Sequence, residues 1–332
     1  MLHSSASHRP GAMVARMAEQ PRRPRRTVAV AAAVCLAAVV AGCDGGSPGG
    51  SATPTTAAAQ QQTTTSRSAP TETTTAATVR LANANPDRFD RKDFGDPTGD
   101  ANVWLPLIPG NQSVRDGTLF RGSRQLRHRR RITITDAQKV VNGVRTVLVL
   151  DQDLSAGQVA EQAVDYLAQD RHGNVWYLGS YTETYEGGQF VNATDAWLAG
   201  VNGATAGVLM MAKPEVGMPG YVQARIPGRE ILTAEVAKLG ERKCVPFRCF
   251  ADSLAILETG NEFKFYAEGV GHIATEPNYS GGEQEKEALV NVIQLTPKGL
   301  AEMSALALRL DQHARTVAPQ IFGNSAKARR VR

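Results

Sequence analysis

Apolar and polar residues alternate with a period of two along much of the chain, which predicts extended strands. Residues 131–135 alternate in this way, and the β-branched run at 144–150 follows Asn142-Gly143, a dipeptide typical of a tight hairpin turn. The run at 159–168 fits a helix or a strand, and we favour a strand because Val164, Tyr166 and Ala168 alternate with polar neighbours. We expect further strands at 175–184, 221–225, 231–239, 250–258, 262–267, 272–275 and 289–295.

The fold class that follows is mainly β, with a single antiparallel meander over residues 86–295. We expect this meander to form a curved sheet or a partial barrel. The period changes at Thr296-Pro297, an N-cap followed by proline at the first helical position. Apolar residues then recur at helical spacing, which predicts one C-terminal α-helix at 296–318 that lies on the sheet or across its open edge. We expect 319–332 to be a flexible basic tail.

The N-terminal region has the order of segments found in an export signal. A basic segment at 22–26 precedes a run of small or apolar residues at 28–41, which is too short for a permanent membrane span of about 20 residues. The run ends in Val40-Ala41-Gly42-Cys43, which resembles the lipobox of bacterial lipoproteins. We predict that residues 1–42 are a lipoprotein signal peptide and that Cys43 is acylated, which would place the protein on the extracytoplasmic face of the cell membrane. The alternatives are an ordinary signal peptide or an uncleaved anchor with a chance Cys, and Sec and twin-arginine export both stay open.

A tether is expected next, at residues 43–85. From Asp44 to Thr78 there is no Leu, Ile, Met, Phe, Tyr or Trp. Such a segment buries too little apolar surface to offset its ordering entropy, so we expect it to be disordered.

The charge is unevenly placed. The chain of 332 residues has a formal net charge of +5, but residues 1–42 carry six Arg and one Glu, so the remainder is neutral. This gives no case for a nucleic-acid partner.

Three motifs resemble a known group of proteins. They are Trp104-Leu105-Pro106-Leu107-Ile108-Pro109-Gly110, the turn and strand that begin at Asp170 and run through Gly173-Asn174-Val175-Trp176-Tyr177 to Gly179, and the stretch from Tyr266-Ala267 to Gly269-Val270-Gly271. Together they resemble a family of uncharacterised bacterial extracytoplasmic proteins, many of them lipoproteins, over about residues 100–295. The resemblance implies an exported β domain and supplies no reaction, ligand or catalytic residue.

Cys244 and Cys249 are the two cysteines that would remain in the exported domain once the leader is removed and Cys43 is acylated. Export favours disulfides, and Pro246 suits a turn between them. We therefore predict a Cys244–Cys249 disulfide, with a Cα separation of about 4.4–6.8 Å.

Several patterns that resemble catalytic or metal motifs are interpreted as structural. Gly45-Gly46-Ser47-Pro48-Gly49 lies in the tether and lacks the strand and helix of a nucleophile elbow. Gly269-Val270-Gly271 is expected to be a hairpin turn rather than a dinucleotide site, and His172 a solvated turn residue rather than a metal ligand or general base. Four carboxylates converging from two strands would suit acid–base work or Ca²⁺, though such residues are ordinary at strand ends: Asp151, Asp153, Asp165 and Asp170. We assign no catalytic residue, metal or cofactor.

The leading functional hypothesis is non-catalytic binding of an apolar or amphiphilic envelope molecule or of a protein partner. A possible apolar pocket is assigned to Trp104, Trp176, Trp197, Met210, Tyr221 and Tyr266. The apolar, glycine-rich stretch at 200–211 is a lip over that pocket or a buried connector. The alternatives are a structural or interaction protein of the envelope without a cavity and, less favoured, a hydrolase.

Two ladders of like charge have equal pitch. Arg127, Arg129 and Arg131 share one face of an extended run, and Glu283, Glu285 and Glu287 share another. Placed on neighbouring strands they would neutralise one another. The alternative is two separate solvated patches, of which the Arg patch is a candidate surface for anionic lipids.

Overall fold

The computed structural model describes residues 88–121, 124–259, 262–278 and 283–331. The predicted leader, Cys43 and the tether lie outside the described residues.

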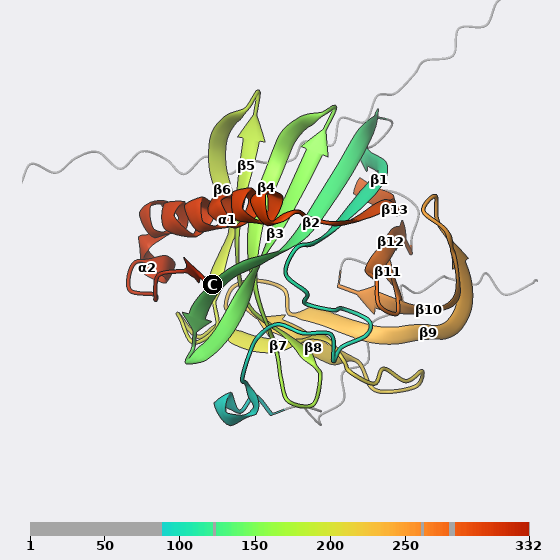
Figure 1. The fold of residues 1–332 in the computed structure, drawn as a ribbon, viewed down its shortest axis with the longest axis horizontal. Coiled ribbons are helices and arrows are strands. Elements are labelled where there is room, and N and C mark those ends of the chain that lie inside the picture. Colours follow the sequence, from blue (N-terminus) through green and yellow to red (C-terminus); the bar gives the residue numbers. More distant parts are fainter. Residues whose placement is uncertain (1–87, 122–123, 260–261, 279–282, 332) are drawn as a thin grey trace, which may run out of the picture. The chain divides into compact units, whose positions relative to one another are not determined.

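Fourteen strands of the described chain belong to one antiparallel sheet (Figure 1). They are β1 (Asn111–Arg121), β2 (Arg124–Val141), β3 (Val144–Ser155), β4 (Gln158–Gln169), β5 (Val175–Glu186), β6 (Gln189–Leu198), β7 (Thr205–Met210), β8 (Tyr221–Arg225), β9 (Leu232–Cys244), β10 (Cys249–Glu258), β11 (Glu262–Ala267), β12 (Gly271–Pro277), β13 (Glu283–Gln294) and β14 (Arg329–Arg330).

The sheet closes on itself. Its order runs β1-β13-β12-β11-β10-β9-β8-β7-β5-β4-β3-β2, and β1 also pairs with β2, so twelve strands form a closed barrel. β6 pairs with β5 and β14 with β2 outside this ring. The prediction of a curved sheet or partial barrel is therefore wrong. The closing strand was missed because Asp116 and Gly117 interrupt the apolar pattern of β1, whose place depends on pairing with a strand about 170 residues later.

Tight turns connect the long strands. Asn142 and Gly143 have φ values of 48° and 81°, and Val141 pairs with Val144 across them. These left-handed values match the twist that a two-residue hairpin requires, which confirms the turn predicted there. The predicted hairpin turn at Gly269-Val270-Gly271 is also present, between β11 and β12.

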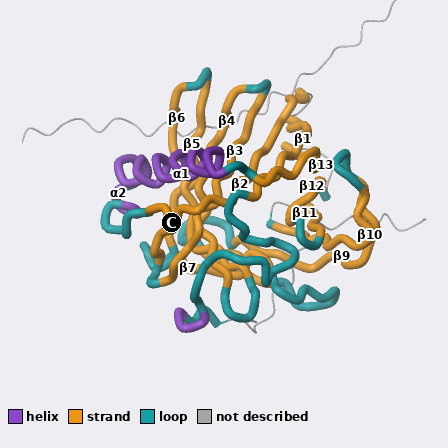
Figure 2. The backbone as a smooth tube through the Cα atoms, in the orientation of Figure 1, coloured by secondary structure: helices purple, strands orange, loops and turns teal. Residues whose placement is uncertain are grey.

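A helix covers part of the outer wall of the barrel. α1 (Pro297–Val317) begins at the predicted cap, where the Thr296 hydroxyl accepts a hydrogen bond from the Gly299 amide at 3.2 Å. It lies against β2, β3, β4 and β5, as Figure 2 also shows. Its buried Ala307, Leu310 and Ala314 join one hydrophobic core with residues of the barrel wall. A second core of eight buried residues packs among β10, β11, β12 and β13 and the turn before them.

The chain after α1 is folded, where a flexible basic tail was expected. α2 (Pro319–Phe322) buries Phe322, and β14 pairs with β2. The Arg330 guanidinium donates to both Asp136 carboxylate oxygens, at 2.8 and 2.6 Å. These contacts, which involve a residue almost 200 positions away, have no signature in the local sequence.

The segment before β1 crosses one end of the barrel. The fully buried Asn102 donates to the carbonyl oxygens of Gly173, Met210 and Met211, and the Gly269 amide donates to the Val103 carbonyl. The first and third sequence motifs therefore meet at this end. The second motif forms the turn between β4 and β5, where the Asp170 carboxylate accepts from Trp176 Nε1 at 2.8 Å. All three motifs serve the architecture of the barrel.

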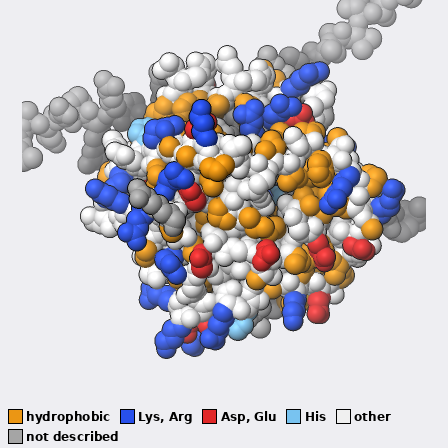
Figure 3. Space-filling model, viewed as in Figure 1, with side chains coloured by type: hydrophobic (Ala, Val, Ile, Leu, Met, Phe, Trp, Pro, Cys, Tyr) orange, Lys and Arg blue, Asp and Glu red, His pale blue; other side chains and the backbone are white. Residues whose placement is uncertain are grey.

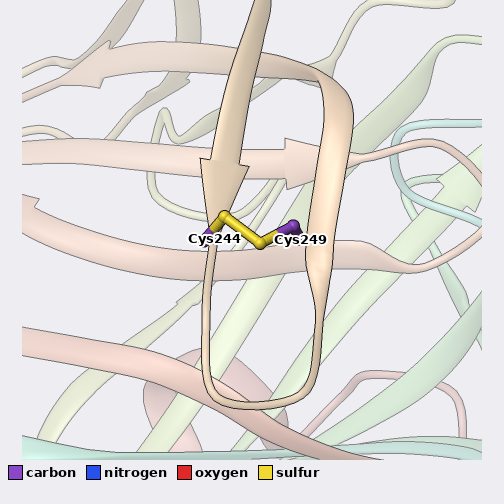
Figure 4. Close-up of a disulfide and its surroundings, with 2 residues drawn as sticks. All are labelled: Cys244 and Cys249. Carbon is purple, nitrogen blue, oxygen red and sulfur yellow. A yellow bond between two sulfur atoms is a disulfide. The ribbon is translucent and has the colours of Figure 1, made fainter.

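A disulfide joins Cys244 to Cys249 at the end of the β9–β10 hairpin (Figure 4). The two residues are directly paired across the strands, and their Cα atoms lie 3.9 Å apart, closer than the expected range.

On the face shown in Figure 3, Lys and Arg side chains are interspersed with Asp and Glu.

Candidate functional site

The inner wall of the barrel lines a cavity of about 430 Å³ that is partly open to solvent. Side chains of alternate strand residues reach it, such as Val149 and Asp151 of β3 and Ala163 and Asp165 of β4. The intervening residues Leu148, Leu150, Val164 and Tyr166 are fully buried in the core that α1 joins. The barrel wall is therefore apolar on the outside, under the helix, and partly polar on the inside.

The inner wall combines an apolar part with an excess of carboxylates. The apolar part includes Leu105, Leu107, Ile132, Ile134, Val149, Leu167, Leu209, Leu232, Val270 and Val292. The acidic lining residues are Asp151, Glu161, Asp165, Asp195, Glu258 and Glu262. The lining cations are Arg115, Arg130 and Lys264. With all of these groups ionised, the wall carries a net charge of −3.

Within the described part of the chain, two of the carboxylates form no ion pair. Asp165 accepts a hydrogen bond from the Tyr177 hydroxyl at 2.8 Å, and Glu161 forms no ion pair with the described residues. Burial, reinforced by the charge of Asp151, raises the pKa of Asp165 to about 6. Burial and nearby carboxylates likewise raise the pKa of Glu161 to about 7, against the opposing influence of Arg130. This part of the wall favours a proton or another positive charge.

On the opposite part of the wall, one lysine is shared by two glutamates. Lys264 Nζ lies 2.6 Å from Glu258 and 3.3 Å from Glu262, and the Gln223 amide donates to Glu258 at 2.9 Å. Asp151 of β3 pairs with Arg130, and Asp195 of β6 pairs with Arg229. The lining carboxylates without a cationic partner among the described residues are therefore Glu161 and Asp165, both on β4.

A buried ion network adjoins the cavity on β1, β2 and β13. The side chain of His128 is 2% exposed and is surrounded by three carboxylates. Its Nδ1 lies 2.8 Å from Asp153, and its Nε2 lies 2.5 Å from Glu285 and 3.5 Å from Glu287. Burial alone would lower the pKa of His128, but these carboxylates raise it to about 11.

Two arginines complete this network. Arg115 Nε donates to Glu287 at 2.7 Å, and Arg130 Nε lies 3.1 Å from Asp151. Burial opposes ionisation of Glu287, yet Arg115 and His128 hold its pKa well below the usual range. Charge pairing therefore favours the ionised forms of His128 and Glu287.

The pairing predicted between the two charge ladders is wrong. β1 lies between β2 and β13, so the Arg and Glu ladders are not on neighbouring strands. Arg129 pairs with Asp116 of β1, at 2.5 Å. The cations that do meet Glu285 and Glu287 are His128 and Arg130, on the other face of β2, and Arg115 of β1.

The predicted apolar pocket is not where the sequence placed it. Of its six residues only Tyr266 lines the cavity, and the other five are buried in the core: Trp104, Trp176, Trp197, Met210 and Tyr221. The stretch at 200–211, expected to be a lip or a connector, contributes β7, and Leu209 reaches the cavity. Tyr177 and Tyr266 are the aromatic residues that line the cavity, and the three tryptophans are buried in the core.

The predicted group of four aspartates is only partly assembled. Asp151 and Asp165 line the cavity and Asp153 contacts His128. Asp170 lies in the β4–β5 turn against Trp176, and His172 is exposed beside it. Sequence reasoning missed Arg115, Glu161, Glu258 and Lys264 as members of the site. For Glu161 there was a signal, since it shares the two-residue period of Ala163 and Asp165.

No family model and no curated protein matches the sequence. A Bacteroides fragilis structure described as an exported protein with a YmcC-like fold is 12% identical, with a TM-score of 0.31, and the match covers 58% of this chain and 99% of that chain. A lipoprotein structure from Parabacteroides distasonis is 11% identical, with a TM-score of 0.32 and coverage of 58% and 99%. A β-barrel-like protein of the domain of unknown function DUF1849 from Brucella abortus is 13% identical, with a TM-score of 0.32 and coverage of 57% and 98%.

These three structures come from proteins described as exported, as a lipoprotein or as β-barrel-like, and TM-scores this low carry no argument for the present chain. The family resemblance seen in the motifs stays a prediction. Within the described ranges, neither α1 nor α2 combines the length and the apolarity that a membrane-spanning helix needs.

Proposed function

We propose that this protein is a non-catalytic binding protein of the cell envelope whose barrel takes a small amphiphilic molecule with a positively charged group. The observation that supports this proposal is the partly open cavity of about 430 Å³, which combines an apolar wall with the carboxylates Glu161 and Asp165 of β4. Small-molecule sites in proteins have about this size and combine apolar walls with a few placed polar groups.

The ligand chemistry follows from the uncompensated charge. Glu161 and Asp165 are partly buried, and neither has a cationic partner within ion-pair distance among the described residues, so their negative charges are costly. A ligand ammonium group would supply that charge, and its alkyl part would pack against lining residues such as Ile134, Val149 and Leu167. The sequence analysis allowed an apolar or an amphiphilic ligand. The charges that line the cavity favour an amphiphilic cation.

The other two hypotheses are less well supported. A purely structural envelope protein has no use for a cavity of this size lined with partly buried carboxylates. A hydrolase of the histidine-dependent class needs an imidazole that is free to take a proton from the nucleophile. The one imidazole among the lining residues, His272, instead has Nε2 2.9 Å from the Ala274 carbonyl oxygen and 3.1 Å from the Thr275 hydroxyl.

Octylamine and octanoate are suitable probes, because they share an alkyl chain and differ in charge. Calorimetric titration of the full chain should show binding of octylammonium and none of octanoate. The double variant E161Q/D165N should weaken octylammonium binding by at least about tenfold, since each change removes a charged hydrogen-bond acceptor. E186Q, at an exposed glutamate of the β5–β6 hairpin, is the matched control and should bind normally. Equal binding of octanoate, or unchanged affinity in the double variant, would overturn the proposal.

The membrane anchor is a separate part of the proposal, and the lipobox-like sequence that ends at Cys43 supports it. Labelling of the producing cells with an alkyne-bearing fatty acid should mark the wild-type chain. Cys43→Ala should abolish the label and block cleavage before residue 43. Undiminished label on this variant would exclude lipidation at Cys43, without bearing on the cavity.

A further inference from the structure

Three side chains of the ion network converge on one point. His128 comes from β2, and Glu285 and Glu287 come from β13, two strands away. One ligand atom from each lies within 4.8 Å of the others. They meet across β1 because the residue in register with both His128 and Glu287 is Gly117, which has no side chain to separate them.

The atoms at this point are buried and incompletely satisfied. Both ring nitrogens of His128 and Oε2 of Glu287 lack a hydrogen bond of standard geometry, although oxygens lie within ion-pair distance of the ring. His128 is 4% exposed and Glu287 1%. Buried polar atoms are nearly always hydrogen-bonded. Here the ring nitrogens of His128 lie close to carboxylate oxygens without the geometry of a hydrogen bond.

Neighbouring side chains orient the candidate ligand atoms of His128 and Glu287 toward the shared point, as outer-shell groups do around a bound metal. Asp153 lies 2.8 Å from Nδ1 of His128, which leaves Nε2 for the shared point. Arg115 and the Thr275 hydroxyl both bind Oε1 of Glu287, at 2.7 and 3.1 Å, which leaves Oε2 for it. A carboxylate behind a ligating histidine is the usual outer-shell arrangement of zinc proteins.

The charges also leave room for a divalent cation. The network holds four carboxylates and two guanidinium groups, a net charge of −2 when His128 is neutral: Asp151, Asp153, Glu285, Glu287, Arg115 and Arg130. A divalent cation at the shared point would make the network neutral. A proton on Nε2 of His128 is the competing occupant, and it would leave a charge of −1.

The distances suit zinc after a small movement. Two ligand atoms on a tetrahedral zinc ion lie roughly 3.3 Å apart, given bond lengths of about 2.0 Å. The separation of 3.5 Å between Nε2 of His128 and Glu287 matches this value. The Glu285 oxygen, at 2.5 Å, would have to withdraw by somewhat less than ~1 Å. Its side chain is 20% exposed and has room on the solvent side.

We propose that His128, Glu285 and Glu287 bind one divalent transition-metal ion, with Zn²⁺ as the representative ion. Imidazole and carboxylate ligands together suit zinc and its first-row neighbours. Nothing in this proposal depends on the cavity ligand, because the metal site uses different side chains.

Zinc binding to the full chain, first stripped of metal with a chelator, tests this site. Calorimetry should show one equivalent of Zn²⁺ bound, and the thermal midpoint should rise when zinc is added. E285Q is the best variant, since Glu285 is the most exposed of the three ligands and its loss disturbs the fold least. It should lower zinc affinity by more than about tenfold, and D153N should lower it by about 10–100-fold through the orientation of His128.

H172Q is the matched control, because His172 is an exposed histidine at the other end of the barrel and should leave zinc binding unchanged. Cobalt substitution gives a readout that needs no variant, since Co²⁺ bound to nitrogen and oxygen ligands in a tetrahedral site has intense visible absorption bands. Absence of stoichiometric zinc binding would overturn the proposal. Zinc bound equally well by E285Q and D153N, or a cobalt spectrum of the hydrated ion, would overturn it as well.

Discussion

At the scale of single residues, Asn102 joins three parts of the chain. Its Nδ2 donates to Gly173, Met210 and Met211 carbonyl oxygens, at 2.8 to 3.2 Å, and its Oδ1 accepts from two amides of its own segment. Asn102→Ala would leave these buried groups without partners, so we expect a loss of at least about 2–3 kcal/mol in the free energy of unfolding. Urea denaturation measures this loss. N192A, at an exposed asparagine of β6, is the control, and a similar small effect for both variants would contradict the role of Asn102.

Glu161 and Asp165 make stability depend on pH. Their pKa values are raised in the folded chain, to about 7 and about 6, from ordinary values of 4.5 and 3.8. Because folding favours their protonated forms, their contribution is fully present below about pH 4 and is lost as pH rises through 6 and 7. The charged and titratable groups that act on them are Arg130, Asp151, Asp153, Tyr177, Asp195 and Glu285.

We therefore expect E161Q/D165N to gain stability relative to the wild type as pH rises from 4 to 8. Urea unfolding at several pH values, with E186Q as the control, measures the difference between the two proteins. A difference that stays constant across this range would show that the two carboxylates titrate normally.

At this scale the sequence identified residue types better than their roles. Asp151 and Asp165 were singled out correctly as carboxylates that converge, and both line the cavity. The tryptophans were assigned to a pocket, but Trp176 and Trp197 are core residues. A period of two shows that a strand has an apolar and a polar face, but it does not show which face is enclosed. Here the polar face is enclosed by the barrel, and the apolar face is covered by α1 and the core.

At the scale of elements, one buried ion pair ties α1 to β2. Lys139 Nζ lies 2.6 Å from Asp311, whose carboxylate also accepts from the Tyr166 hydroxyl at 2.7 Å. Burial lowers the pKa of Lys139, and Asp311 offsets this only in part. Asp311→Ala would leave the buried ammonium unpaired, and we expect it to cost about 3–5 kcal/mol in the free energy of unfolding.

Replacing both partners tests whether the cost comes from the stranded charge. The double variant K139M/D311L should lie much closer to the wild type than D311A, because it removes both charges and keeps the apolar volume. A double-mutant cycle by chemical denaturation measures the coupling. Equal losses in D311A and K139M/D311L would show that the ion pair contributes net stability of its own.

Elements with a strong local signal were predictable, and those defined by pairing were not. Thr296-Pro297 and the helical period gave α1 with its cap, and Asn142-Gly143 gave the β2–β3 hairpin. β14 and β1 have no such signal. β14 is two residues long, and it forms because α1 and α2 return the chain to the exposed edge of β2 near Asp136.

At the scale of the whole barrel, closure decides whether the polar interior is separated from solvent. β1 closes the ring, since it pairs with β13 through eleven residues and with β2 through ten. No property of residues 111–121 alone predicts two partners, because the information lies in the complementarity of three distant segments. The ion network forms at this seam, so neither it nor the cavity was within reach of local patterns.

Gly117 offers a test of closure. A Cβ at this position would lie 1.9 Å from the carbonyl oxygen of Lys286 and 2.6 Å from Cα of Glu287, so β1 and β13 would have to separate. We expect Gly117→Ala to cost about 1–3 kcal/mol or more in the free energy of unfolding, because the obstacle is backbone rather than a flexible side chain. Hydrogen–deuterium exchange should rise in β1 and β13 and stay unchanged in β4 and β5, on the other side of the ring. Gly95→Ala is the control, because a Cβ there meets nothing within 4 Å. If G117A exchanged and unfolded like G95A, the β1–β13 seam would tolerate opening, and closure would not be what holds the polar interior together.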